Sequence, residues 1–67
     1  MSSIFDEEFV RGNLNAGNLS VAEKYLKDYI AEHETFNARP YYYLAIVMNA
    51  LNNETETITA LNNAISR

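Results

Sequence analysis

The chain has 67 residues, no cysteine and a formal net charge of −4. A domain of this size lies near the lower limit for a fold maintained by a hydrophobic core alone, and without cysteine no disulfide or thiolate zinc site can supplement that core. The five basic residues are scattered along the sequence, which argues against direct nucleic-acid binding. We therefore predict one domain, residues 1–67, without a metal or cofactor.

No segment predicts secretion or membrane insertion. Asp6, Glu7 and Glu8 follow the first apolar side chains, and no basic residue precedes them, so a signal peptide is not expected. The longest apolar run, Pro40 to Leu51, is shorter than the ~20 residues that span a bilayer. We predict a cytoplasmic protein with no membrane contact.

The first predicted helix covers residues 4–15. Ser3 is positioned to cap it, with Asp6 three residues later as the partner of a capping box. Gly12 lies inside this helix and weakens it unless a neighbouring helix needs the space of a missing side chain. Residues 15–18, Asn-Ala-Gly-Asn, are typical of a helix end followed by a turn.

The second predicted helix follows Ser20, which forms a capping box with Glu23. Behind this box, apolar residues recur in adjacent pairs four residues apart, ending with Tyr29 and Ile30. This is the pattern of an amphipathic helix. Residues 33–37 are expected to be a connector, because no helical stripe passes through them.

The third predicted helix runs from Ala38 or Pro40 to Leu51 and is apolar on nearly every side. A segment of this kind has to be covered from several directions, so we expect it to be the central helix. The residues predicted to contribute to the core are Leu44, Ala45, Val47, Met48 and Leu51.

A fourth helix is expected after a turn at residues 52–54, with Asn53 or Thr55 as its N-cap. Its predicted inward stripe is Ile58, Leu61, Ala64 and Ile65. Short connections place successive helices antiparallel. The predicted fold is therefore all-α, with four short antiparallel helices that form two helix-turn-helix hairpins.

The two hairpins, whose turns at Asn18 and Asn53 are 35 residues apart, resemble the tetratricopeptide (TPR) repeat, a pair of helices with a period of 34 residues. Positions that match the pattern of the repeat are Gly17, Ala22, Leu26, Leu44, Ala45, Leu61 and Ala64. Positions that depart from it are Val10, Tyr29, Pro40 and Thr57. The resemblance implies an α-solenoid fragment that binds a peptide or protein on the surface lined by its first helices. A plain four-helix bundle is the alternative.

No catalytic or metal-binding constellation is found. His33 is the only histidine, and its neighbours Glu32 and Glu34 point in different directions on a helix. Ser20 has neither a glycine-rich elbow nor a base partner. The carboxylates at residues 6–8 spread round most of a helical turn and do not converge on a cation. We predict that the protein is not an enzyme.

The tyrosine triplet at residues 41–43 is the best candidate for a binding surface. Successive helical residues are about 100° apart, so three cannot all face one core, and tyrosine is favoured at interfaces. In the repeat alignment Tyr42 faces the ligand groove, with Ile46 one turn later. Coverage of these residues by the first helix or the chain ends is an equal alternative. The candidate partner-binding residues are Arg39, Tyr42, Tyr43, Ile46 and Asn49.

The favoured function is a non-enzymatic interaction module or adaptor that binds a partner protein or peptide through the aromatic face of the third helix. Two repeats are fewer than the three usually needed for stability, so association with another chain, including a homodimer, would supply the missing burial. The alternative is a small acidic inhibitor or accessory protein, encoded by a phage or mobile element, that blocks a basic or nucleic-acid-binding surface. The carboxylates of the first helix and the pair Glu54 and Glu56 motivate this alternative.

Overall fold

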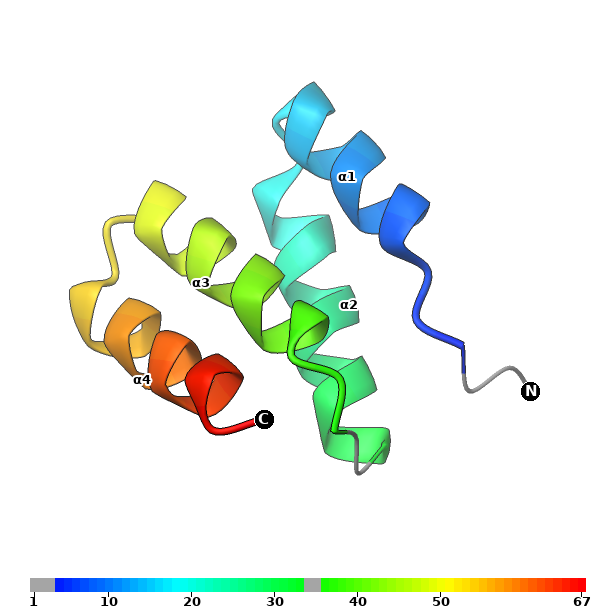
Figure 1. Cartoon of the computed structure of the whole chain (residues 1–67). Coiled ribbons are helices and arrows are strands. Elements are labelled where there is room, and N and C mark those ends of the chain that lie inside the picture. Colours follow the sequence, from blue (N-terminus) through cyan, green and yellow to red (C-terminus); the bar gives the residue numbers. More distant parts are fainter. Residues whose placement is uncertain (1–3, 34–35) are drawn as a thin grey trace.

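The computed structural model, which describes residues 4–33 and 36–67, has four helices and no strand in these ranges (Figure 1). The helices are α1 (Glu7–Ala16), α2 (Leu19–Glu32), α3 (Arg39–Ala50) and α4 (Glu54–Ile65). The predicted all-α fold of two helical hairpins is confirmed. None of the helices in the described ranges is long and apolar enough to cross a membrane.

The first helix starts later than predicted. Asp6 is the N-cap of α1, and its carboxylate accepts a hydrogen bond from the backbone N–H of Phe9 at 3.0 Å. The predicted start at residue 4 and the role of Asp6 as a partner of Ser3 are therefore wrong, and Ser3 itself lies outside the described residues. Aspartate caps as well as serine, and this start places Glu7 and Glu8 in the first turn, where the helix dipole favours carboxylates.

The connection between α1 and α2 is tighter than predicted. Gly17 adopts the left-handed conformation with φ of 78° and ends α1. The backbone N–H of Asn18 donates to the carbonyl of Asn13 at 2.8 Å, and the same Asn18 is the N-cap of α2. The predicted cap Ser20 is wrong, because this turn lets α2 begin at Leu19. Ser20 lies exposed in the first turn of α2.

The connection between α3 and α4 follows the prediction. Asn53 is the N-cap of α4, and its side-chain oxygen accepts from the backbone N–H of Glu56 at 3.2 Å. Its side-chain amide donates to the carboxylate of Glu56 at 2.8 Å, so the Asn53 side chain satisfies one backbone N–H of the first turn and also binds the Glu56 side chain.

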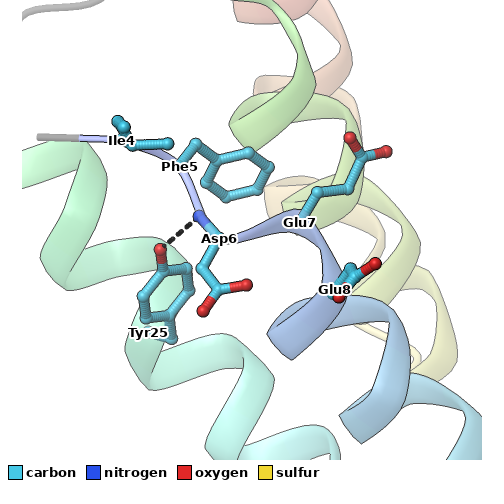
Figure 2. Close-up of a pocket in the computed structure, with 6 residues that line it drawn as sticks. All are labelled: Ile4, Phe5, Asp6, Glu7, Glu8 and Tyr25. Carbon is cyan, nitrogen blue, oxygen red and sulfur yellow. Dashed lines mark hydrogen bonds between the residues drawn. The ribbon is translucent and has the colours of Figure 1, made fainter.

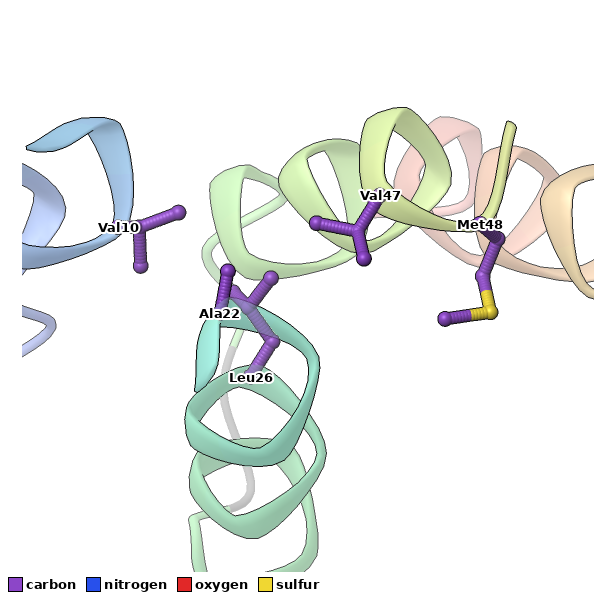
Figure 3. Packing of buried hydrophobic residues seen from close by; sticks show 5 residues of the cluster. All are labelled: Val10, Ala22, Leu26, Val47 and Met48. Carbon is purple, nitrogen blue, oxygen red and sulfur yellow. The ribbon is translucent and has the colours of Figure 1, made fainter. Parts of the chain in front are cut away.

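The helices pack in series, with α3 between α2 and α4. The central cluster draws its side chains from α1, α2 and α3 (Figure 3). Its buried members are Val10, Ala22, Leu26, Val47 and Met48. The molecule measures 30 × 27 × 15 Å, so it is a thin slab and its core is small. The expected central position of α3 is confirmed.

The predicted core is only partly correct. Ala45, Val47 and Met48 are buried, whereas Leu44 is half-buried and Leu51 is exposed. Leu51 forms the C-cap of α3 and is followed by the turn to α4.

The predicted inward stripe of α4 is wrong for three of its four residues. Ile58, Leu61 and Ile65 are exposed, Ala64 is half-buried, and the buried residue of α4 is Ala60. Ala60 and Glu56 lie on the same side of α4, four residues apart. Ala60 is buried and Glu56 contacts Lys27 of α2 at 3.3 Å, so Ile58, Leu61 and Ile65 on the opposite side face solvent.

Candidate functional site

One side of α3 is exposed over its whole length. Arg39, Tyr42, Ile46 and Asn49 recur at intervals of three and four residues, so they share one face of the helix, called the α3 face below. Tyr42 is 54% exposed and Ile46 is 38% exposed, while residues on the opposite side of α3 are buried. The α3 face is therefore a continuous surface with an aromatic ring, an aliphatic side chain and an amide.

The three tyrosines of the triplet have different surroundings. Tyr41 is buried, Tyr42 is exposed and Tyr43 is half-buried, as the angle between successive helical residues requires. The rings of Tyr42 and Tyr43 meet edge to face with their centroids 6.1 Å apart. Tyr42 therefore contacts Tyr43 and remains 54% exposed.

Tyr43 links α3 to α1 and supports the α3 face from one side. Its hydroxyl donates a hydrogen bond to Oε2 of Glu7 at 2.5 Å, and its ring centroid lies 6.0 Å from that of Phe5. The hydrogen bond to Glu7 raises the pKa of Tyr43 above its ordinary value. Tyr43, a predicted partner-binding residue, therefore already has partners within the chain.

Arg39 is held by the same carboxylate. Its Nη1 lies 2.6 Å from Oε1 of Glu7, so both oxygens of Glu7 are occupied by groups of α3. The pKa of Glu7 is lowered, first by the hydrogen bond from Tyr43 and then by the one from Arg39. Because its charge is balanced by Glu7, Arg39 contributes little net charge to the α3 face.

Glu7 is the residue of this region that sequence reasoning missed. The sequence indicated only a solvated carboxylate in a first helical turn, whereas Glu7 contacts Arg39 and Tyr43, which follow it by 32 and 36 residues. No local pattern signals a contact at such a separation. A carboxylate in the first turn of a helix looks the same in the sequence in either role.

Tyr41 links α3 to the end of α4. The Nη2 atom of Arg67 donates to the hydroxyl of Tyr41 at 2.9 Å, and the guanidinium carbon lies 4.1 Å from the ring centroid. Tyr41 is therefore part of the packing between α3 and α4 and does not contribute to the α3 face.

An open depression lies beside the start of α1 (Figure 2). It is lined by Ile4, Phe5, Asp6, Glu7, Glu8 and Tyr25. The backbone N–H of Asp6 donates to the hydroxyl of Tyr25 at 2.8 Å, and the Phe5 ring packs against Tyr25, Tyr29 and Tyr43 with centroids 5.3 to 6.0 Å apart. These contacts hold the segment before α1 against α2 and α3.

His33 extends the group of aromatic rings formed by Phe5, Tyr25 and Tyr29. Its ring centroid is 4.5 Å from that of Tyr29, and it forms the C-cap of α2. Among residues 4–33 and 36–67, no three histidine, aspartate or glutamate side chains gather in a group that could hold a metal ion. Glu34, considered above as a neighbour of His33, lies outside the described residues.

Comparison with known proteins adds no relationship to this geometry. No protein-family model matches the chain, and no match was found among curated proteins or among solved structures.

Proposed function

We propose that the protein is a non-enzymatic interaction module that binds a partner protein or peptide on the α3 face. The observation that carries this proposal is the exposure of Tyr42 and Ile46, one helical turn apart, on a helix whose other side is buried. Large apolar side chains grouped on a surface favour contact with another chain, because association removes them from water.

The contacts around Tyr42 make it suitable for binding. Its neighbour Tyr43 is fixed by the hydrogen bond to Glu7 and contacts one edge of the Tyr42 ring. A ring that is already supported loses less conformational freedom when a partner covers it, so more of the contact energy remains as affinity. Tyrosine also brings a hydroxyl that can stay at the wet rim of an interface.

The charge of the α3 face indicates the chemistry of the partner segment. Arg39 is paired with Glu7, and Asn49 offers an amide that both donates and accepts hydrogen bonds. A segment with one or two apolar side chains for Tyr42 and Ile46, and a polar group for Asn49, complements this surface. Partner recognition then depends on apolar contact more than on charge.

We also propose that the two hairpins form a TPR-like pair. The packing in series and the contact between α1 and α3 through Glu7 and Tyr43 support this arrangement. In such a pair the ligand surface is lined by the first helix of each hairpin, and the α3 face lies on the first helix of the second hairpin.

Capture of partners from the native host tests the proposal. The bait is the full chain, compared with Tyr42→Ala and with Val21→Ala, a matched control in which a similarly exposed side chain on α2 is removed. We expect Tyr42→Ala to lose the captured protein and Val21→Ala to retain it. With the purified partner, Tyr42→Ala should raise the Kd about tenfold or more in calorimetry.

Two outcomes contradict the proposal. Equal capture by Tyr42→Ala and by the unsubstituted chain would remove the α3 face as the site. An affinity that falls steeply with added salt would favour the acidic-inhibitor alternative instead. Four acidic side chains of the described part already form ion pairs with lysine or arginine, which leaves less charge for that alternative. They are Glu7, Glu23, Asp28 and Glu56.

A further inference from the structure

The second exposed apolar surface lies on α4. Ile58, Leu61 and Ile65 recur at intervals of three and four residues, so they form one row, called the α4 stripe below. They are 53%, 39% and 81% exposed, respectively. This row is apolar over about two helical turns, and within the described part of the chain it is not covered by another helix.

In the first hairpin, the row of α2 that corresponds to the α4 stripe packs against another helix. Counted from the N-caps Asn18 and Asn53, Leu26 and Leu61 occupy the same position in α2 and α4, 35 residues apart. Leu26 is fully buried, in a cluster that includes Val47 of α3. The row of α2 that contains Leu26 therefore receives a helix, and the corresponding row of α4 has the apolar side chains needed to receive one.

Charge on α4 favours a second copy of the same chain as the occupant. With a net charge of −4, two copies repel each other unless they meet through a surface that lacks like charges. The exposed residues beside the α4 stripe are uncharged, namely Thr55, Thr59, Asn62 and Ser66. The charged residues lie at the helix ends, with Glu54 at the start and Arg67 just after the last turn, while Glu56 pairs with Lys27.

We propose that the α4 stripe binds the α4 stripe of a second copy in an antiparallel, two-fold symmetric pair. In this pairing Ile58 packs against Ile65 of the second copy, and Leu61 lies near the two-fold axis. The two Glu54 carboxylates then lie at opposite ends of the pair, while each Arg67 stays on Tyr41 of its own copy. A parallel pairing would instead bring two Glu54 carboxylates together, which costs free energy.

The opposite end of the molecule disfavours a head-to-tail arrangement. Glu8, Arg11 and Asn15 are exposed on the outer side of α1, beside Phe9, which is 41% exposed. Placing these side chains on the α4 stripe would desolvate charges without giving them partners. The symmetric pair is therefore closed, and it does not extend into a filament. It also leaves the α3 face, on another helix, for the proposed partner.

The size of the contact sets its strength. Three apolar side chains from each copy form a small interface, and interfaces below about 1,200 Å² are typical of weak, reversible association. We therefore expect dimers that dissociate on dilution. Sedimentation equilibrium of the full chain over a wide concentration range should show this exchange between monomer and dimer.

Cysteine cross-linking tests the arrangement directly, because the chain has no cysteine of its own. Under mild oxidation, Leu61→Cys should form a disulfide-linked dimer by itself. Ile58→Cys and Ile65→Cys should cross-link when mixed with each other and only poorly alone. Ile46→Cys, on the α3 face, is the matched control and should remain monomeric under the same conditions.

A charge variant tests the energetics. Leu61→Asp places two like charges beside the two-fold axis and should weaken dimer formation about tenfold or more. Ile46→Asp, at a side chain of similar exposure, should leave dimer formation unchanged. Circular dichroism checks that both variants fold, and the cross-linking result supplies an answer that does not depend on Leu61→Asp folding.

Three results would overturn the proposal. One is a chain that remains monomeric at the highest concentration reached. Another is self cross-linking of Ile58→Cys and Ile65→Cys that equals their cross-linking as a mixture. The third is a dimer lost in Ile46→Asp and kept in Leu61→Asp, which would place self-association on the α3 face.

Discussion

The hydroxyl of Tyr43 in α3 donates a hydrogen bond to Oε2 of Glu7 in α1, across 36 residues of sequence. The other oxygen of Glu7 binds Arg39 at 2.6 Å. One carboxylate thus joins the starts of α1 and α3 and borders the α3 face. Because both contacts favour the ionised form, they hold the pKa of Glu7 below its ordinary value.

This shift predicts how stability depends on pH. A carboxyl whose pKa is lowered by folding stabilises the folded chain above its unfolded pKa, here about 4.5, and that stabilisation is lost as the pH falls toward the folded pKa. We expect the unsubstituted chain to melt at a higher temperature than Glu7→Gln at neutral pH, and the difference to shrink below about pH 4.5.

Melting curves followed by circular dichroism at several pH values between neutral and acidic measure this difference. Glu8→Gln is the matched control, because Glu8 is exposed in the same helical turn and lies apart from Arg39 and Tyr43 in the contacts above. Glu8→Gln removes the same charge from the same turn without breaking the contacts with Arg39 and Tyr43, so at neutral pH it should lower the melting temperature less than Glu7→Gln does. A Glu7→Gln difference that is the same at neutral and acidic pH would show that ionisation of Glu7 does not stabilise the fold.

Leu26 and Leu51 should differ strongly as sites of substitution. Leu26 is fully buried in the central cluster, so Leu26→Ala leaves a cavity and should lower the free energy of unfolding by ~2–5 kcal/mol. Leu51 is exposed at the end of α3, and Leu51→Ala should cost less than about 1 kcal/mol. Urea denaturation measures both. Equal costs would mean that Leu51 is covered in solution.

The same two residues show what could be predicted from the sequence. Helix number and ends depend on local signals, and Gly17 and Asn53 indicated two of the turns correctly. Leu51 looked like a core residue because it ends an apolar run, but its burial depends on where the chain turns next. The prediction of the inward side of α4 was also wrong, because the side that is buried depends on packing against α3, which the pattern within α4 does not contain.

In the candidate site, too, features set by local sequence could be predicted and contacts between distant residues could not. The exposure of Tyr42 could be expected from the spacing of helical residues, because three successive tyrosines cannot share one environment. The contacts of Arg39 and Tyr43 with Glu7 could not, because a pattern within one helix carries no information about a carboxylate in another. The row of Ile58, Leu61 and Ile65 was recognised as apolar, but a row of this kind looks identical whether its own chain or a second copy covers it.

The two asparagine caps should contribute unequally to stability. The side chain of Asn53 accepts from the backbone N–H of Glu56, whereas that of Asn18 makes no capping hydrogen bond to α2. We expect Asn53→Ala to lower the free energy of unfolding by about 1 kcal/mol, and Asn18→Ala to cost less than half of that. Chemical denaturation of both variants checks this, and a larger cost for Asn18→Ala would contradict the capping geometry described for α2 and α4.

The two glycines should respond to alanine with opposite signs. A Cβ added at Gly12, inside α1, meets no atom of another helix within 4 Å, so Gly12→Ala should raise the free energy of unfolding by about 0.5–1 kcal/mol through reduced freedom of the unfolded chain. Gly17 has φ of 78°, a conformation that strains alanine, so Gly17→Ala should lower the free energy of unfolding by about 1–2 kcal/mol. Thermal and urea unfolding of Gly12→Ala and Gly17→Ala measure the two changes in the free energy of unfolding. Destabilisation by Gly12→Ala would mean that the outer side of α1 packs closely against a second molecule.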